Sequence, residues 1–315
     1  MRLRQLEKIP FWGACCLLAL AFLVGAVPLA ALSVEGDLGS DHAGGLWAWN
    51  RDRSELVLVP KDGPRRVVKV GAARAVDAHA EWGVATAPLD AGGYQVKVVS
   101  WDGAVERRVS LPLEICNLAW LGPGKVVVAL STDPSLLGVL DLETGEIGER
   151  IGKAEPAPTR PGAYFGRATL LAVDLQRERI HTLDGFSGAY RLFAFSGAEL
   201  GSSAVANPER PRLEEWLAGW DAEARQRGRV EFATMWSFPL ALDGEGKAWT
   251  VQACEPATGR VVLARFEAGS EPALHELSLD CCTRNMTILS GNLVMAPGPR
   301  TEEGLRCNLE RRLPR

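Results

Sequence analysis

Short hydrophobic runs alternate with turns rich in Gly, Pro, Asp and Ser along residues 45–310. Runs of this kind, bounded by turn residues, are typical of β-strands. The clearest example is Thr169–Asp174, which is followed by a polar turn and then by Ile180–Asp184. After another turn come Tyr190–Phe195 and a shorter run near residues 199–200. This pattern predicts a small antiparallel sheet of four strands.

The same succession of strands and turns recurs, with starting points near residues 46, 76, 117, 168, 234 and 285. The spacing of roughly 30 to 66 residues brackets the forty-odd residues of a propeller blade. We therefore predict an all-β fold, a β-propeller of about six four-stranded blades. The last set of strands is incomplete, so we expect a strand from around Leu32 to Leu38 to close the ring. A pair of β-sandwiches is the alternative.

The repeat also resembles a known fold class. Ala172-Val173-Asp174 is an apolar strand ending in Asp, and Arg179-Ile180-His181 begins the strand after the polar turn. This arrangement resembles the six-bladed β-propeller class, particularly its NHL-like and TolB-like members. The resemblance covers roughly residues 45–310. It implies a fold and does not imply a reaction.

The N-terminal residues read as a targeting segment. Arg2, Arg4 and Lys8 precede an uncharged apolar run from Phe11 to Leu32. A basic flank followed by such a run is typical of an export signal, and its length is also sufficient to span a bilayer. We predict that residues 1–33 are a signal peptide cleaved after Ser33 or an uncleaved signal anchor. Residues 34–315 are then an extracytoplasmic β-propeller, in the periplasm or cell envelope.

Two insertions interrupt the repeat. Residues 151–166 are rich in proline and predict a loop without a helix. Within residues 207–228, the apolar side chains of Leu213, Trp216, Leu217 and Trp220 follow the spacing of one helix face. We predict a helical insertion here. It either packs on the propeller through its two tryptophans or serves as a lid or docking helix.

Charge limits the partners that this chain can have. The 315 residues include 35 Lys and Arg and 39 Asp and Glu, for a formal net charge of −4. Nucleic-acid binding requires a basic surface, so we expect no nucleic-acid partner. We also expect no cofactor, because the sequence contains no phosphate-binding glycine loop.

Five of the seven cysteines lie in the predicted exported part. Disulfides persist outside the cytoplasm. The predicted blades place all five cysteines at the end of the propeller that carries the insertions. Four of them can pair with one another, which leaves Cys116 without a partner. The disulfide candidates are Cys254, Cys281, Cys282 and Cys307. A thiolate metal site is the alternative, although the spacing does not favour it.

Candidate catalytic residues are few. Some propeller enzymes hold a metal ion in the central channel, and the matching positions here offer His79 and Asn117, with Asp77 nearby. This set has a single histidine, which makes it a poor set of metal ligands. We therefore expect a protein that is not an enzyme. The alternative is a metal-dependent propeller hydrolase or lyase with a channel site near His79.

A recognition surface fits the sequence better. The insertion-bearing end carries a mixture of Arg, Tyr, Trp and Asn, which is typical of binding surfaces. We predict a binding or scaffold protein for a protein or peptide partner, held at the membrane through its N-terminal segment. A third reading is a structural part of an envelope complex. The predicted binding residues are Arg74, Tyr94, Asn117, Tyr164, Arg167, Trp216, Trp220, Arg284 and Asn285.

Overall fold

A computed structural model covers the chain, and its contacts divide it into two units, residues 1–33 and 34–315. The described strands all belong to the second unit. The structure describes residues 38–50, 53–88, 94–131, 133–154, 169–185, 187–205, 240–255, 260–278, 285–289, 292–296 and 310–312.

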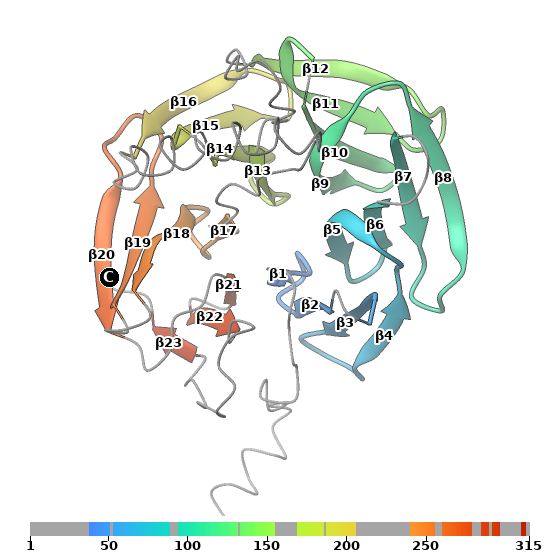
Figure 1. Ribbon diagram of the computed structural model, residues 1–315, viewed down its shortest axis with the longest axis horizontal. Coiled ribbons are helices and arrows are strands. Elements are labelled where there is room, and N and C mark those ends of the chain that lie inside the picture. Colours follow the sequence, from blue (N-terminus) through green and yellow to red (C-terminus); the bar gives the residue numbers. More distant parts are fainter. Residues whose placement is uncertain are drawn as a thin grey trace, which may run out of the picture. The chain divides into compact units, whose positions relative to one another are not determined.

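The described residues form antiparallel sheets in which each strand pairs with the next along the chain (Figure 1). The first sheet is β1 (Leu38–Ser40), β2 (Leu46–Asn50), β3 (Glu55–Val59) and β4 (Arg66–Lys69). The second is β5 (Ala73–His79), β6 (Gly83–Pro88), β7 (Tyr94–Val99) and β8 (Val105–Leu111). The third is β9 (Ile115–Gly122), β10 (Lys125–Leu130), β11 (Ser135–Asp141) and β12 (Ile147–Lys153).

The second half of the chain repeats this arrangement. The fourth sheet is β13 (Thr169–Asp174), β14 (Arg179–Asp184), β15 (Ala189–Ala194) and β16 (Glu199–Ala204). The fifth is β17 (Ala241–Leu242), β18 (Ala248–Glu255), β19 (Arg260–Phe266) and β20 (Ala273–Ser278). The last sheet has three strands, β21 (Asn285–Leu289), β22 (Asn292–Ala296) and β23 (Glu310–Arg312).

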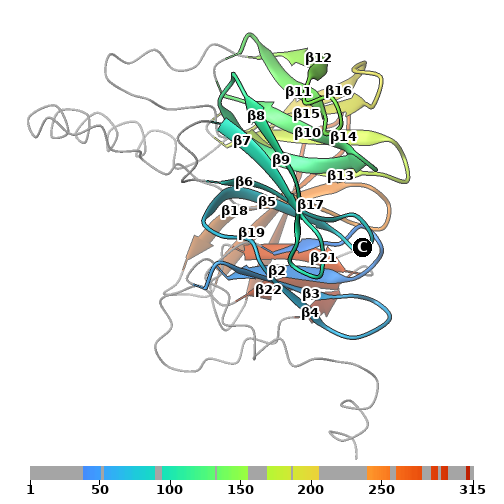
Figure 2. The same cartoon turned by 90° about the vertical axis from the view of Figure 1, so that its right-hand side faces the viewer.

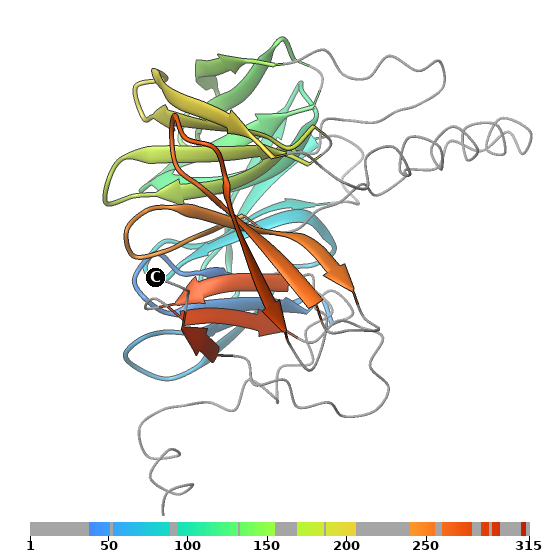
Figure 3. The same cartoon turned by 90° about the vertical axis from the view of Figure 1, so that its left-hand side faces the viewer.

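The sheets are arranged in a cycle around a common centre (Figure 1). The first strand of each sheet contacts the first strand of the next, from β1 through β5, β9, β13 and β17 to β21, and β21 contacts β1. This is a β-propeller. The side views in Figures 2 and 3 show how strongly the sheets are twisted between their inner and outer strands.

The described residues form five four-stranded blades, so the prediction of about six is wrong. The runs after residue 285 supply three strands that pair, not four. The predicted closing strand is also different from the observed one. β1 pairs with β2 as the inner strand of the first blade, and it contacts the last sheet only from the side.

The inner strands all run in the same direction. Arg74 near the start of β5 contacts Glu114 and Ile115 at the start of β9, while Asp77 near the end of β5 contacts Trp120 near the end of β9. Each blade therefore has an entry end, where its inner strand begins, and an exit end, where that strand turns into the next one. Loops between the second and third strands also lie at the entry end.

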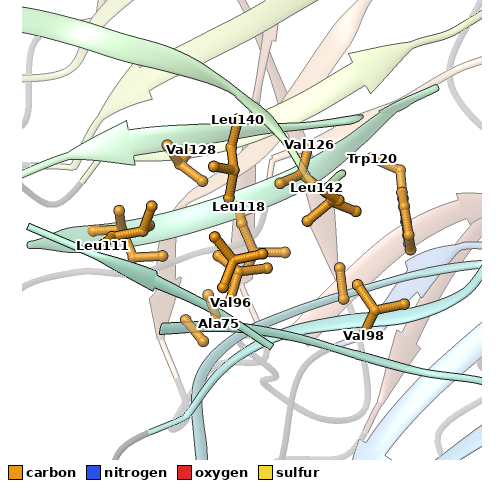
Figure 4. Packing of buried hydrophobic residues seen from close by; sticks show 14 of the residues in the cluster. Ala75, Val96, Val98, Leu111, Leu118, Trp120, Val126, Val128, Leu140 and Leu142 are labelled. Atoms are coloured by element: carbon orange, nitrogen blue, oxygen red, sulfur yellow. The ribbon is translucent and has the colours of Figure 1, made fainter. Parts of the chain in front are cut away.

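Apolar side chains fill the space between neighbouring blades. One buried cluster joins the second and third blades through residues such as Val96, Leu118, Trp120 and Val128 (Figure 4). Each sheet carries apolar side chains on its faces, and a single blade is too small to bury them by itself. They are buried by packing against the neighbouring blade. A blade thus depends on its neighbours for stability.

Two predicted features lie outside the described residues. These are the N-terminal signal or anchor at residues 1–33 and the helical insertion at residues 207–228. The part of the chain that the structure describes contains no helix with the length and hydropathy required to cross a membrane.

Candidate functional site

At the entry end, two predicted binding residues connect neighbouring blades. The Arg74 guanidinium lies 2.7 Å from the Glu114 carboxylate and also donates a hydrogen bond to the carbonyl of Ile115 at 3.3 Å. The Asn117 side chain donates to the carbonyl of Thr169, 3.3 Å away, and accepts from the Leu118 amide. Both side chains therefore link the inner strands of adjacent blades. Their contact with a partner stays a prediction.

The structure says less about the other predicted binding residues. Tyr94 begins β7 and Asn285 begins β21, and only the backbone of each is described. The remaining candidates, Tyr164, Arg167, Trp216, Trp220 and Arg284, lie outside the described residues.

The exit end holds a cluster that joins three blades. One Asp77 carboxylate oxygen, Oδ2, accepts a hydrogen bond from the Trp120 backbone amide at 2.8 Å. The same oxygen lies 3.3 Å from Nε2 of His42, in the turn after β1. The other oxygen accepts from the Ala78 amide at 2.9 Å. His42 has a φ of +60°, which is uncommon for a residue with a side chain and is typical of positions held by their surroundings.

A row of aromatic rings extends from this cluster. The His42 and His79 rings are 6.0 Å apart and nearly parallel, and His79 stacks on Trp82 with a centroid distance of 3.6 Å. Trp82 in turn contacts the buried Trp120 edge-on at 5.7 Å. His42 and Trp82 are each partly exposed, whereas His79 is buried. We call His42, His79 and Trp82 the exit-end shelf.

Hydrogen bonding defines the proton position on His79. Its Nδ1 accepts from the Glu81 backbone amide at 3.2 Å, so the neutral ring carries its proton on Nε2. Burial lowers the pKa of His79, and the neighbouring His42 lowers it further. His79 is therefore neutral at physiological pH.

The charge state of His42 is different. Burial lowers the pKa of His42, but the carboxylate of Asp77, with smaller contributions from Asp41 and Asp174, outweighs burial and raises this pKa above its ordinary value. Asp174 ends β13 in the fourth blade, so carboxylates of several blades act on one imidazole. The Asp77 carboxylate therefore stabilises the protonated form of His42 relative to that of a free imidazole.

Asp41 illustrates how these turns are built. Its Oδ1 accepts from the amides of Ala43 and Gly45, two and four residues later. In the fifth blade, Asp243 accepts from the amides of Glu245 and Lys247 in the same way. An aspartate that directly follows the inner strand thus closes the turn to the second strand, as aspartate side chains commonly do in turns.

The two aspartates differ in the hydrogen bonding of their second carboxylate oxygen, Oδ2. Asp243 Oδ2 accepts from the indole Nε1 of Trp249 at 2.8 Å. Asp41 Oδ2 is buried and has no hydrogen-bond partner among the described residues. The equivalent indole, that of Trp47, instead lies over Gly39, where even a Cβ would overlap the ring. One buried carboxylate oxygen beside the shelf is left unpaired as a result.

Acidic residues predominate in the exit-end turns of the five four-stranded blades. These turns contain eleven acidic residues, Asp41, Asp62, Glu81, Asp102, Glu143, Glu146, Glu178, Asp243, Glu245, Glu267 and Glu271. They contain four basic residues, Lys61, Arg65, Arg177 and Lys247. Two of the basic side chains are paired locally, Arg177 with Asp174 at 2.9 Å and Lys247 with Glu245 at 3.1 Å. Acidic residues therefore outnumber basic ones in these turns.

The channel metal set predicted from sequence is not assembled. His79 ends β5 at the exit end, while Asn117 lies near the start of β9 at the entry end. The sequence prediction grouped them as channel positions on or beside inner strands, without distinguishing the two ends of a strand. Within the described residues, no group of three or more His, Cys, Asp or Glu side chains is placed to hold a metal ion.

The disulfide prediction is untested. Cys254 pairs with Val261 in the β18–β19 ladder, and its side chain is not described. Cys281, Cys282 and Cys307 lie outside the described residues. Cys116 is a free thiol whose pKa is raised by burial, and its Sγ lies 3.6 Å from the Ala129 carbonyl.

Sequence analysis did not find the exit-end shelf. Asp77 was named only as a neighbour of His79, and His42 and Trp82 were not among the binding candidates. A signal was present, because Ala75-Val76-Asp77 repeats Ala172-Val173-Asp174. Aligning these two triplets places His79 after the strand-ending aspartate, and therefore at the exit end.

The strand order and the cyclic contacts define the class: the described chain is a β-propeller. No model of a known protein family matches the sequence, and no curated protein matches it. Solved structures resemble the fold. One is a protein of unknown function from Bacteroides thetaiotaomicron, with 11% identity and a TM-score of 0.47, over 83% of this chain and 66% of that one.

Two further similar structures have names. Virginiamycin B lyase from Staphylococcus aureus has 10% identity and a TM-score of 0.46, over 80% of this chain and 73% of the lyase. The Cps50 (Swd1) β-propeller domain from Myceliophteria thermophila has 10% identity and a TM-score of 0.45, over 84% of this chain and 92% of that domain. These likenesses carry no inference about activity.

Proposed function

We propose that this protein is a non-enzymatic binding propeller that recognises a protein or peptide partner on the exit-end shelf. The observation that carries the proposal is the stacking of the partly exposed Trp82 on the buried His79, with 3.6 Å between ring centroids. Aromatic side chains that are fixed in this way provide contact area without losing conformational entropy on binding.

The surroundings of the shelf also favour recognition. Asp77 is hydrogen-bonded to the backbones of two blades and contacts His42 of a third, which holds the shelf in one geometry. Preorganised surfaces bind more tightly because less ordering accompanies the association. We further propose an extracytoplasmic location, based on the basic flank and apolar run of residues 1–33.

Selection from a random peptide display library tests the proposal on the full-length protein. Selected peptides should bind wild type and should lose at least about fivefold in affinity on Trp82→Ala, because truncation of a central aromatic residue commonly costs more than about 1 kcal/mol. Leu274→Ala is the control. Leu274 is a 57% exposed apolar residue on the outer strand β20, far from the inner strands in strand order.

Two results would contradict this function. One is a library that yields no peptide bound by the wild-type protein. The other is a set of selected peptides whose binding is equally reduced by the Trp82 and Leu274 substitutions. The folded state of each variant is checked by circular dichroism before binding is compared.

A further inference from the structure

The environment of the exit-end shelf indicates the chemistry of the partner. The exit-end turns carry many more acidic than basic residues, and Glu81 and Glu178 project from the inner turns with exposed side chains. Glu81 is adjacent to Trp82, and Glu178 follows β13, whose last residue, Asp174, acts electrostatically on His42. The field at the shelf is therefore negative.

A second observation is independent of these exposed charges. Asp41 is 1% exposed, and its Oδ2 has no hydrogen-bond partner among the described residues. Asp41 directly precedes His42 of the shelf in the chain, and its charge acts to raise the pKa of both His42 and His79. An unpaired buried carboxylate oxygen is costly, and it is a favourable neighbour for an incoming cation. In the equivalent turn of the fifth blade, the oxygen is satisfied by Trp249.

We infer that the exit-end shelf binds a cationic peptide segment, whose lysine or arginine side chain packs against Trp82 and is attracted by the carboxylates of the exit end. This inference rests on the proposed function and names the chemistry of its partner. Lysine and arginine suit such a surface because their stems pack on aromatic rings while their charged groups face carboxylates.

The inference has a consequence for pH dependence. The groups that face His42 are Asp77, Asp41, Asp174 and His79. Protonated His42 repels an incoming cation, and neutral His42 does not. Because the carboxylates raise the pKa of His42, its proton is lost only above the ordinary pKa of about 6.5. Binding of a cationic peptide should therefore strengthen as pH rises from 6 to 9.

The test measures binding of a fluorescein-labelled octalysine peptide to the full-length protein by anisotropy. The double substitution Glu81→Gln/Glu178→Gln should weaken binding by roughly fivefold, the size expected for two exposed charge interactions. Trp82→Ala should weaken it further. Glu106→Gln/Glu149→Gln is the matched control, since it removes the same charge from exposed positions on the outer strands β8 and β12.

The His42→Asn variant gives a readout that general charge attraction would not give. Wild type should bind octalysine at least about threefold more tightly at pH 9 than at pH 6, and His42→Asn should abolish this dependence. Equal loss in the two glutamate double variants, or a pH profile unaffected by His42→Asn, would overturn the inference.

Failure of this inference can be distinguished from failure of the proposed function. If octalysine does not bind, and the library selects peptides without lysine or arginine that still require Trp82, the cationic partner is wrong and the binding function stands. If the library selects no peptide that depends on Trp82, the proposed function is itself wrong.

Discussion

Buried histidines in this propeller differ in whether their surroundings raise or lower their pKa. His181 on β14 is 1% exposed, and its Nδ1 lies 2.8 Å from the hydroxyl of Tyr190. Burial lowers the pKa of His181 to about 4, and burial raises the pKa of Tyr190. The hydrogen bond therefore joins a neutral imidazole to a neutral tyrosine hydroxyl. The pKa of His42 is raised instead, because the effect of the nearby carboxylates outweighs that of burial.

His181 should make the protein sensitive to acid. Its pKa is lower in the folded state than in the unfolded state, so the unfolded state takes up a proton first as the pH falls below about 6.5. We predict a loss of about 3 kcal/mol of unfolding free energy between pH 6.5 and pH 4 from this residue. Urea unfolding at a series of pH values measures it.

The matched variant for this prediction is His181→Gln, which keeps an acceptor for Tyr190 and does not titrate. Its stability should fall less steeply with acid than that of wild type. Parallel pH profiles for the two proteins would show that another group causes the acid sensitivity.

Hairpins and their turns form the next level of organisation. Gly83 begins β6 with a φ of +89°, and a Cβ at this position would lie 2.5 Å from the carbonyl oxygen of Val99 on β7. Gly103, in the β7–β8 turn, has the same φ, but nothing lies within 4 Å of its Cβ position. The two glycines thus separate the cost of backbone conformation from the cost of close packing.

We predict that Gly103→Ala destabilises the protein by about 1 kcal/mol, through its positive φ alone. Gly83→Ala adds a steric overlap with a backbone atom that cannot easily move, and should cost about 3 kcal/mol. Denaturant unfolding of both variants measures the difference. Equal destabilisation would mean that the β6–β7 contact relaxes and that strand packing there is loose.

For the whole molecule, stability depends on contacts between blades. Apolar clusters lie between neighbouring sheets, and a few polar contacts join inner strands of different blades. Among the inner-strand residues described above, Asp77 is the one whose side chain contacts residues of three blades. Its Oδ2 is shared by the Trp120 amide and His42, which come from the third and first blades.

We predict that Asp77→Ala destabilises the propeller by about 2 to 3 kcal/mol, since it leaves the buried Trp120 amide without its acceptor. Asp102→Ala is the control, because Asp102 bonds only within its own exposed turn, to Ser100 and Ala104. Hydrogen exchange should show increased opening at β9 and in the β1–β2 turn for the first variant. Opening confined to the second blade would indicate that Asp77 does not connect blades.

Most strands were predictable because their signals are local. The predicted strand Thr169–Asp174 is confirmed as β13, and the other predicted runs within the described residues agree with observed strands to within a few residues. Alternation of apolar and polar residues defines which face of a strand is buried, and Gly, Asp and Pro define its ends. Neither signal depends on residues far away in the chain.

The candidate site was not predictable in the same way. Residues 46–50 were assigned to an inner strand, but they form β2, because the short run of residues 38–40 takes the inner position. The error changes which turns face the exit end in the first blade. His79 was grouped with Asn117 as a channel position, although the two lie at opposite ends of their inner strands.

Local chemistry in the chain is thus enough to give an all-β protein built from successive antiparallel hairpins with aspartate-closed turns. The meeting of His42, Asp77 and Trp120 joins residues that are 35 and 43 positions apart. The number of four-stranded blades likewise depends on how strands are grouped into sheets. The physical reason is that a strand's position in its blade depends on which neighbouring blade buries its apolar side chains. That burial exists only once the ring of sheets has formed.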